Sequence, residues 1–280
     1  MKICDIDFQN DIYIYMTTII QQSGNKSHYY YTFLGNKWKE IKKFEHYLCI
    51  NEDTIFIEPF AGSAAVSYYL WKHNKCKNIN INDRDPLIWE LWNIMIDENK
   101  RIDKINEINM IVENITTKEE YNRIVKIKSK HETLNNKIIA YTWFNYRPGI
   151  YPIDKKKPEY SKILNIPYND FLKSVKQTCD DFRVICDKHK DNPNAFIFLD
   201  PPYVNEDNCF YFNDGTIYDM EAIYQYMHDL MKSNAKILMI VSDTLLSRLL
   251  YRDYIRGSYD KNYSLSKKKT RHLIISNIII

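Results

Sequence analysis

Asp200 and the two prolines after it are the residues of this chain whose order most directly indicates chemistry. They end the apolar run "FIFL" (196–199), and Tyr203 follows immediately. Pro201 and Pro202 have no backbone N–H and keep Asp200 out of a helix, so the stretch offers carbonyl oxygens and a carboxylate but almost no donors. This arrangement suits a ligand that donates two hydrogen bonds, such as an exocyclic amine.

The N6 amine of adenine matches these acceptors. If Asp200 accepts one N–H and the carbonyl of Pro201 the other, the nitrogen lone pair is directed toward an incoming methyl group. Tyr203 would stack on the base, and a base inside a duplex would have to flip out to reach the pocket. A strand ended by prolines without any chemistry is the alternative. An acid at the carboxyl end of a buried parallel strand favours the site.

A second stretch, residues 53–71, predicts the cofactor half of such a site. It reads as a strand (Thr54 to Ile57), a loop of small residues and a helix, and Asp83 ends the next strand 21 residues after Gly62. That separation suits an acid that binds the ribose of a nucleoside-containing cofactor. The loop has neither GxGxxG nor a P-loop, so S-adenosylmethionine, which has no phosphate, fits better than a dinucleotide or a nucleoside triphosphate.

The elements around these motifs predict an α/β fold with a Rossmann-like sheet. Further strands are expected at 78–83, 195–199, 235–241 and 271–280, with a helix at 218–233. Asp83 and Asp200 are 117 positions apart, which is too far for one crossover. We therefore expect a methyltransferase domain in two parts, 1–97 and 177–280, around an inserted, mainly helical target-recognition domain at 98–176; residues 1–28 form an N-terminal extension without an assigned role.

Charge and composition limit the partners. The net charge is +3, yet Lys100 to Lys162 contains fourteen Lys and Arg against eight Asp and Glu. This surplus suits a solvated helical face or a polyanion such as DNA. The six cysteines and seven histidines show no metal-ligand spacing. No segment has the length of a membrane span, so we expect the cytoplasm or another intracellular compartment that holds DNA, whether the gene is cellular, viral or from a phage.

Three motifs resemble the Dam-type (D12 class) DNA adenine-N6 methyltransferases: "YTFLGNKW" (31–38), "FIEPFAGSAAV" (56–66) and "FLDPPY" (198–203). Their order, with a recognition domain between the second and the third, is also similar to that family. Ala64 stands where the family usually has a second glycine and could crowd the methionine end of the cofactor. The resemblance implies that the cofactor contacts are Phe33, Lys37, Asp83 and Asp200, with the loop Glu58, Pro59, Phe60, Ala61, Gly62 and Ser63 lining the site.

The predicted function is site-specific transfer of a methyl group from S-adenosylmethionine to a flipped adenine of double-stranded DNA, with Asp200, Pro201, Pro202 and Tyr203 as the catalytic residues. Phosphates would be bound by Arg147, Lys155, Lys156 and Lys157. A monomer or weak dimer is expected, and a restriction endonuclease is a candidate partner. RNA adenine methylation, N4-cytosine methylation and a catalytically silent DNA-binding protein remain alternatives, because the acceptor pocket suits any exocyclic amine.

Overall fold

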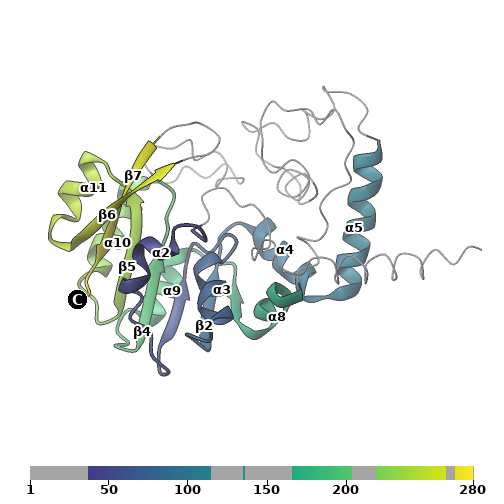
Figure 1. Cartoon of the computed structure of the whole chain (residues 1–280), viewed down its shortest axis with the longest axis horizontal. Coiled ribbons are helices and arrows are strands. Elements are labelled where there is room, and N and C mark those ends of the chain that lie inside the picture. Colours follow the sequence, from purple (N-terminus) through teal and green to yellow (C-terminus); the bar gives the residue numbers. More distant parts are fainter. Residues whose placement is uncertain (1–36, 115–134, 136–165, 204–218, 263–268, 280) are drawn as a thin grey trace, which may run out of the picture.

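The computed structural model describes residues 37–114, 135, 166–203, 219–262 and 269–279. Within these ranges the chain forms one seven-stranded sheet with helices on both faces (Figure 1). In the described part of the chain no helix is long and apolar enough to cross a membrane. The same residues contain no group of three or more His, Cys, Asp and Glu that could bind a metal ion.

The sheet is mostly parallel, which confirms the predicted α/β fold. The strand order is β3-β2-β1-β4-β5-β7-β6. The five strands from β3 to β5 pair in parallel, whereas β7 runs antiparallel to both β5 and β6. The strands are β1 Ile55–Glu58, β2 Asn78–Asn82, β3 Lys176–Thr178, β4 Ala195–Leu199, β5 Lys236–Ser242, β6 Ile255–Asn262 and β7 Lys269–Ser276.

Strand β4 lies in the centre of the sheet, which explains its unbroken apolar sequence. All five of its residues are buried. Phe196 and Phe198 pack into the core on one face of the sheet, whereas Ile197 and Leu199 pack into the core on the other, as the alternation of side chains along a strand requires. A parallel strand covered on both faces needs apolar residues at every position.

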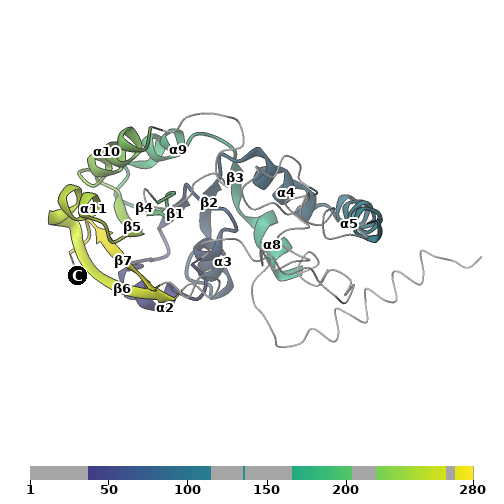
Figure 2. The ribbon, with the colours of Figure 1, turned by 90° about the horizontal axis from the view of Figure 1, so that it is seen from above.

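The helices divide between these two cores. Figure 2 shows α2 and α3 on one side of the sheet and α9 and α10 on the other, with α4, α5 and α8 beyond the β3 end. The α-helices are α2 Ile41–Phe44, α3 Ala65–Lys72, α4 Pro86–Ile96, α5 Glu98–Glu113, α8 Ile166–Ser174, α9 Phe182–His189, α10 Met220–Leu230 and α11 Leu245–Leu250; two short 3₁₀ helices span Glu45–Tyr47 and Arg252–Tyr254.

Two helices close to the site begin at capping residues that the sequence supplies. The carboxylate of Asp85 accepts a hydrogen bond from the N–H of Leu87, and Pro86 occupies the first helical position of α4. Asp181 caps α9 in the same way through the N–H of Arg183. Both helices therefore start at fixed points just after strands β2 and β3.

The sequence patterns located the central strands but missed two strands at the sheet edges. β3 is only three residues long and β6 is mainly polar, so neither has an apolar run. The helix predicted at 218–233 spans Met220–Leu230, and the strand predicted at 271–280 is Lys269–Ser276. This last strand ends early because Asn277 bonds sideways, accepting from the N–H of Ile237 and donating to the carbonyl of Ala235.

Candidate active site

Three acidic residues lie at the carboxyl ends of neighbouring strands, because these strands are parallel. We call this border of the sheet its carboxyl edge. Glu58 is the last residue of β1, Asp83 directly follows β2, and Asp200 directly follows β4. Parallel strands place their carboxyl ends at the same edge, and open α/β sheets bind their ligands there. Residues far apart in the sequence thus share one edge of the sheet.

Asp200 is bonded through both carboxylate oxygens. The ammonium of Lys37, which is 3% exposed, lies 2.6 Å from Oδ2. The hydroxyl of Tyr203 donates to Oδ1 at 3.0 Å, and Lys37 Nζ lies 5.4 Å from the centre of the Tyr203 ring. Pro201 is buried and Pro202 is half-buried. Lys37 and Tyr203 therefore orient the Asp200 carboxylate from both of its oxygens.

The loop after β1 is fastened to the end of β2 by Asp83. The N–H of Gly62 donates to Asp83 Oδ2 at 2.7 Å, and the N–H of Asp85 donates to Oδ1 at 2.9 Å. The N–H of Ala61 donates to the carbonyl of Asn82 at 2.9 Å. Gly62 has a φ of 51°, in the left-handed region where glycine is least strained. The loop and Asp83, which the sequence predicts to belong to one cofactor site, are thus joined by a direct hydrogen bond.

Ala64 also adopts the left-handed conformation, with a φ of 49° and a ψ of 43°. An alanine in this conformation costs about 1 to 2 kcal/mol, so glycine would fit this position with less strain. The side chain is 0% exposed and belongs to the hydrophobic core on the α3 face. Its methyl group therefore faces the core and does not line an open site.

Glu58 is buried at the end of β1. The N–H of Ser67, in the first turns of α3, donates to Glu58 Oε2 at 2.9 Å. Burial raises the pKa of Glu58 from its ordinary 4.5 to about 7, and the negative charge of Asp200 adds to the rise. Near neutral pH this carboxyl therefore exchanges between its protonated and ionised forms.

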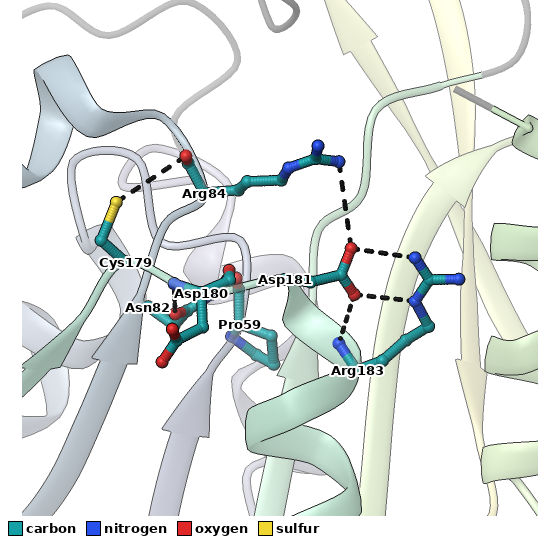
Figure 3. Close-up of polar contacts among 7 residues, drawn as sticks. All are labelled: Pro59, Asn82, Arg84, Cys179, Asp180, Asp181 and Arg183. Atoms are coloured by element: carbon teal, nitrogen blue, oxygen red, sulfur yellow. Dashed lines mark hydrogen bonds and ion pairs between the residues drawn. The ribbon is translucent and has the colours of Figure 1, made fainter. Parts of the chain in front are cut away.

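Asn82 joins three segments beneath this edge. Its side-chain amide donates to the carbonyls of Pro59 and Asp180 at 3.0 Å each, and its Oδ1 accepts from the N–H of Asp180 at 2.9 Å (Figure 3). Thr178 also donates to Oδ1 at 2.7 Å. Asn82 is 0% exposed. Asn82 therefore fixes the loop after β1 relative to β2 and β3. The sequence analysis missed this role, for which the available signal was a polar residue at the end of an otherwise buried strand.

Residues 33–271 match the D12 class N6 adenine-specific DNA methyltransferase family. The chain belongs to that family. The membership supports DNA adenine methylation rather than the RNA, N4-cytosine and catalytically silent alternatives. A methyltransferase also requires a methyl-donor cofactor, for which this edge is the candidate site.

Two relatives of this methyltransferase are type II methyltransferases. The chain is 27% identical over 265 residues to M.CviBI of Paramecium bursaria Chlorella virus NC1A, which covers 87% of this chain and 96% of that protein. It is 24% identical over 217 residues to M.MjaIII of Methanocaldococcus jannaschii, which covers 66% of this chain and 72% of that protein. The likeness extends over most of both relatives.

The remaining predicted site residues of the methyltransferase divide into two groups. Phe60 is half-buried, with its ring centre 4.7 Å from that of Phe182, and Ala61 and Ser63 are buried. The others lie outside the described residues: Phe33, Arg147, Lys155, Lys156 and Lys157.

A second ionic cluster of this methyltransferase lies beside Lys37, and the sequence analysis missed it. The carboxylate of Glu40 is 2.6 Å from Lys261 Nζ, accepts from the hydroxyl of Tyr259 at 2.7 Å, and lies 3.4 Å from His272 Nδ1. Burial opposes the ionisation of Glu40, but the hydrogen bond with His272 and the charges of Lys37 and Lys261 hold its pKa well below the ordinary value. No local pattern links residue 40 to residues 259–272.

Proposed function

We propose that this enzyme transfers the methyl group of S-adenosylmethionine to the N6 amine of an adenine that has rotated out of double-stranded DNA. The observation that carries the proposal is the ionic and hydrogen-bonded arrangement of Lys37, Asp200 and Tyr203 at the end of β4. It holds a carboxylate in a fixed orientation at the edge of the sheet where ligands bind. The donor-free backbone of Pro201 and Pro202 lies beside it.

The chemistry of the side chains at this edge fits S-adenosylmethionine. Asp83 directly follows β2, and its carboxylate oxygens are acceptors of the kind that ribose hydroxyls bind. Lys37 and Asp200 supply opposite charges, which suit the carboxylate and ammonium of the methionine part. The cofactor supplies an electrophilic methyl group. Phe33 and the loop Glu58 to Ser63 are the other proposed contacts.

Asp200 and the carbonyl of Pro201 are proposed to accept the two N–H bonds of the target amine. A carboxylate fixed by Lys37 needs little reorganisation when positive charge develops on the amine nitrogen, and such preorganised acceptors account for a large part of many enzymatic rate enhancements.

Tyr203 is proposed to stack on the flipped adenine. Its hydroxyl is hydrogen bonded to Asp200, so a base whose amine binds Asp200 comes within reach of its ring. The ring is 6% exposed and is already in contact with His272. Binding of the base therefore requires a shift of the ring or of its cover. Stacking of one base on an aromatic ring contributes about 1 to 3 kcal/mol.

Residues 98–176 are proposed to form the DNA target-recognition domain. Helix α5 begins at Glu98, the first residue of this segment, and the segment contains the basic surplus and the proposed phosphate contacts Arg147 and Lys155 to Lys157. A type II enzyme of this kind can protect DNA from a restriction endonuclease, which we propose as a partner. We further propose that it acts as a monomer or weak dimer in an intracellular, DNA-containing compartment.

The test is methyl transfer from isotope-labelled S-adenosylmethionine to duplex DNA, followed by digestion and identification of the labelled nucleoside. Wild-type protein should yield N6-methyladenine, and Asp200→Asn should lose transfer at a temperature where it is folded, although it should melt lower because buried Lys37 loses its counter-ion. Asp243→Asn is the matched control, because Asp243 directly follows the neighbouring parallel strand β5 and pairs with Arg248. Wild-type transfer by Asp200→Asn would overturn the mechanism.

A further inference from the structure

Glu40 lies three residues after Lys37, and a backbone hydrogen bond between the two closes a turn. The N–H of Glu40 donates to the carbonyl of Lys37 at 2.8 Å, and the N–H of Ile41 donates to the same carbonyl at 3.0 Å. A tight turn transmits a displacement of one of its ends to the other. The position of Glu40 therefore sets the position from which Lys37 extends toward Asp200.

The side chain of Glu40 is fastened to the hairpin of β6 and β7. One carboxylate oxygen is 2.6 Å from Lys261 Nζ, and the other accepts from Tyr259 at 2.7 Å and lies 3.4 Å from His272 Nδ1. Glu40 is 8% exposed and His272 is 0% exposed. A carboxylate accepts from several donors at once, and no neutral side chain of this size matches it. Glu40 thus fixes the turn of Lys37 to the opposite end of the chain.

The same hairpin also contacts the other partner of Asp200. The ring of His272 packs edge-on against the ring of Tyr203, with centroids 5.2 Å apart. The hydroxyl of Tyr203 donates to Asp200 at 3.0 Å. Lys37, Asp200, Tyr203, His272 and Glu40 therefore form a closed series of contacts, in which Asp200 and Glu40 lie on opposite sides.

We propose that Glu40 is a positioning residue for methyl transfer, which fixes Lys37 on one side of Asp200 and Tyr203, through His272, on the other. The inference rests on the proposed role of Asp200 and adds to it. Glu40 acts only through other side chains and does not touch the substrate. If its carboxylate is neutralised, Lys261 and Tyr259 lose a common acceptor, and both Lys37 and the hairpin can move.

Glu45 offers a matched control within the same segment. Its carboxylate also binds two lysines and a tyrosine: Lys42 and Lys75 at 2.7 Å each, and the hydroxyl of Tyr69 at 2.6 Å. None of these three partners contacts Asp200 or Tyr203 in the described hydrogen bonds and ion pairs. Glu45→Gln therefore removes a similar set of contacts without disturbing the proposed transfer site.

The first experiment measures the single-turnover rate of methyl transfer and the dissociation constant of S-adenosylmethionine. Glu40→Gln should lower the rate by about 10- to 100-fold, the loss expected when a reacting group is misplaced by about 1 Å. Glu45→Gln should leave the rate within about twofold of wild type, as expected for an exposed ion pair. Equal losses in both variants would contradict a specific role for Glu40.

The second experiment tests whether Glu40 acts through Lys37. If it does, Glu40→Gln should add little to the loss already caused by Lys37→Met, so the combined loss should be well below the product of the two single losses. A role confined to folding would give losses that multiply. Multiplicative losses, measured at a temperature where all four proteins of the cycle are folded, would overturn the inference.

The third experiment separates folding from transfer. Glu40→Gln leaves the charge of Lys261 buried with a weaker partner and can lower the melting temperature for that reason. Glu40→Leu combined with Lys261→Met replaces the ion pair with apolar side chains, which often preserves stability. Because Tyr259 and His272 also lose a partner, the double variant is compared with wild type at a temperature where both are folded, and there it should still transfer at least about tenfold more slowly. Wild-type transfer by the folded double variant would overturn the inference.

Failure of the inference can be distinguished from failure of the proposed function. If Asp200→Asn and Lys37→Met keep wild-type rates, the proposed site is wrong and the Glu40 inference falls with it. If those variants lose transfer but Glu40→Gln and the double variant do not, the site stands and only the inference is overturned.

Discussion

The carboxylates at the ends of β1 and β2 accept hydrogen bonds from backbone N–H groups. The carboxylates of Asp200, after β4, and of Glu40, beside the hairpin of β6 and β7, pair with lysines instead. Asp83 accepts from Gly62 and Asp85, both within 21 residues of it. Asp200 and Glu40 instead pair with Lys37 and Lys261. Backbone donors are fixed by the local fold and carry no net charge, whereas a lysine carries a full charge on a long, flexible chain.

This difference corresponds to the two tasks that we propose for the edge. Neutral, rigid donors suit a binding loop that must present a constant shape to a cofactor. A charge pair suits a carboxylate that must remain ionised and must respond to charge developing on a substrate. Stability and methyl transfer should therefore fall more when Asp200 or Glu40 loses its lysine than when Asp83 or Glu58 loses a backbone donor.

The largest expected effect is that of Lys37→Met. The variant leaves Asp200 without its cation in a partly buried position, and loss of one partner of a buried pair typically costs about 3 to 5 kcal/mol. We expect a drop in the free energy of unfolding toward that range and a loss of methyl transfer of about 100-fold or more. Urea denaturation and single-turnover assays measure the two effects.

Lys42→Met is the control for this variant. Lys42 pairs with Glu45, but its side chain is 73% exposed, so its removal should change neither quantity appreciably. If Lys37→Met behaved like Lys42→Met, the contrast between the two halves of the edge would not hold.

The contrast also explains which parts could be predicted from the sequence. Strands β1, β2 and β4 were found because buried strands have apolar runs, and Gly62 was linked to Asp83 because their separation is a property of a local strand, loop and helix unit. The partners of Asp200 and Glu40 lie 163 and 219 residues away from them. No periodicity connects such pairs.

The missed strands have a similar cause. β3 has three residues and β6 reads "IRGSYDKN", with an irregular register between Ile255 and Gly257. Both are edge strands with one neighbour, so neither needs a continuous apolar sequence. Because β6 was missed, the hairpin that carries Lys261 and His272 was missed too, and with it the second cluster. Lys37 was found only through its resemblance to a family motif.

The next-largest effect is expected at Glu58. Its carboxyl group accepts a backbone hydrogen bond at the end of β1, and its charge depends on pH. Its pKa is about 7 in the folded protein and about 4.5 in the unfolded chain, so between these pH values the folded state holds a proton that the unfolded state releases. This group therefore lowers stability as pH rises from 4.5 through 7, by a total of about 3 kcal/mol.

Glu58→Gln mimics the protonated form and should remove this dependence. Relative to wild type, its free energy of unfolding should be similar at pH 5 and higher by up to about 3 kcal/mol at pH 8. Urea denaturation at the two pH values measures it, with the exposed Glu52→Gln as control. The same difference from wild type at pH 5 and pH 8 would show that Glu58 is ionised throughout.

A smaller effect is expected from Asp83→Asn. An asparagine keeps one acceptor oxygen, so it can bind the N–H of Gly62 or of Asp85 but not both, and one lost hydrogen bond costs about 1 to 1.5 kcal/mol. The dissociation constant of S-adenosylmethionine should rise about tenfold, measured by calorimetric titration. Asp219→Asn alters a carboxylate that caps α10 and should leave the affinity unchanged; equal affinities for all three proteins would exclude Asp83 from the cofactor site.

The smallest effect is expected from Ala64→Gly, which tests whether the loop is strained. Glycine relieves the left-handed conformation, by about 1 to 2 kcal/mol, but it removes a buried methyl group worth about 0.8 kcal/mol and makes the unfolded chain more flexible by about 0.4 to 1 kcal/mol. These terms nearly cancel, so the free energy of unfolding should change by less than about 1 kcal/mol.

The neighbouring alanine separates strain from burial. Ala65 is also buried but begins α3 without a positive φ, so Ala65→Gly brings the same losses with no relief of strain and should be the more destabilising variant. Because the Ala64 methyl group faces the core, the dissociation constant of S-adenosylmethionine should stay within about twofold of wild type in Ala64→Gly. A tenfold gain in affinity would instead mean that this methyl group crowds the cofactor, and that the backbone-bound half is less rigid than its hydrogen bonds indicate.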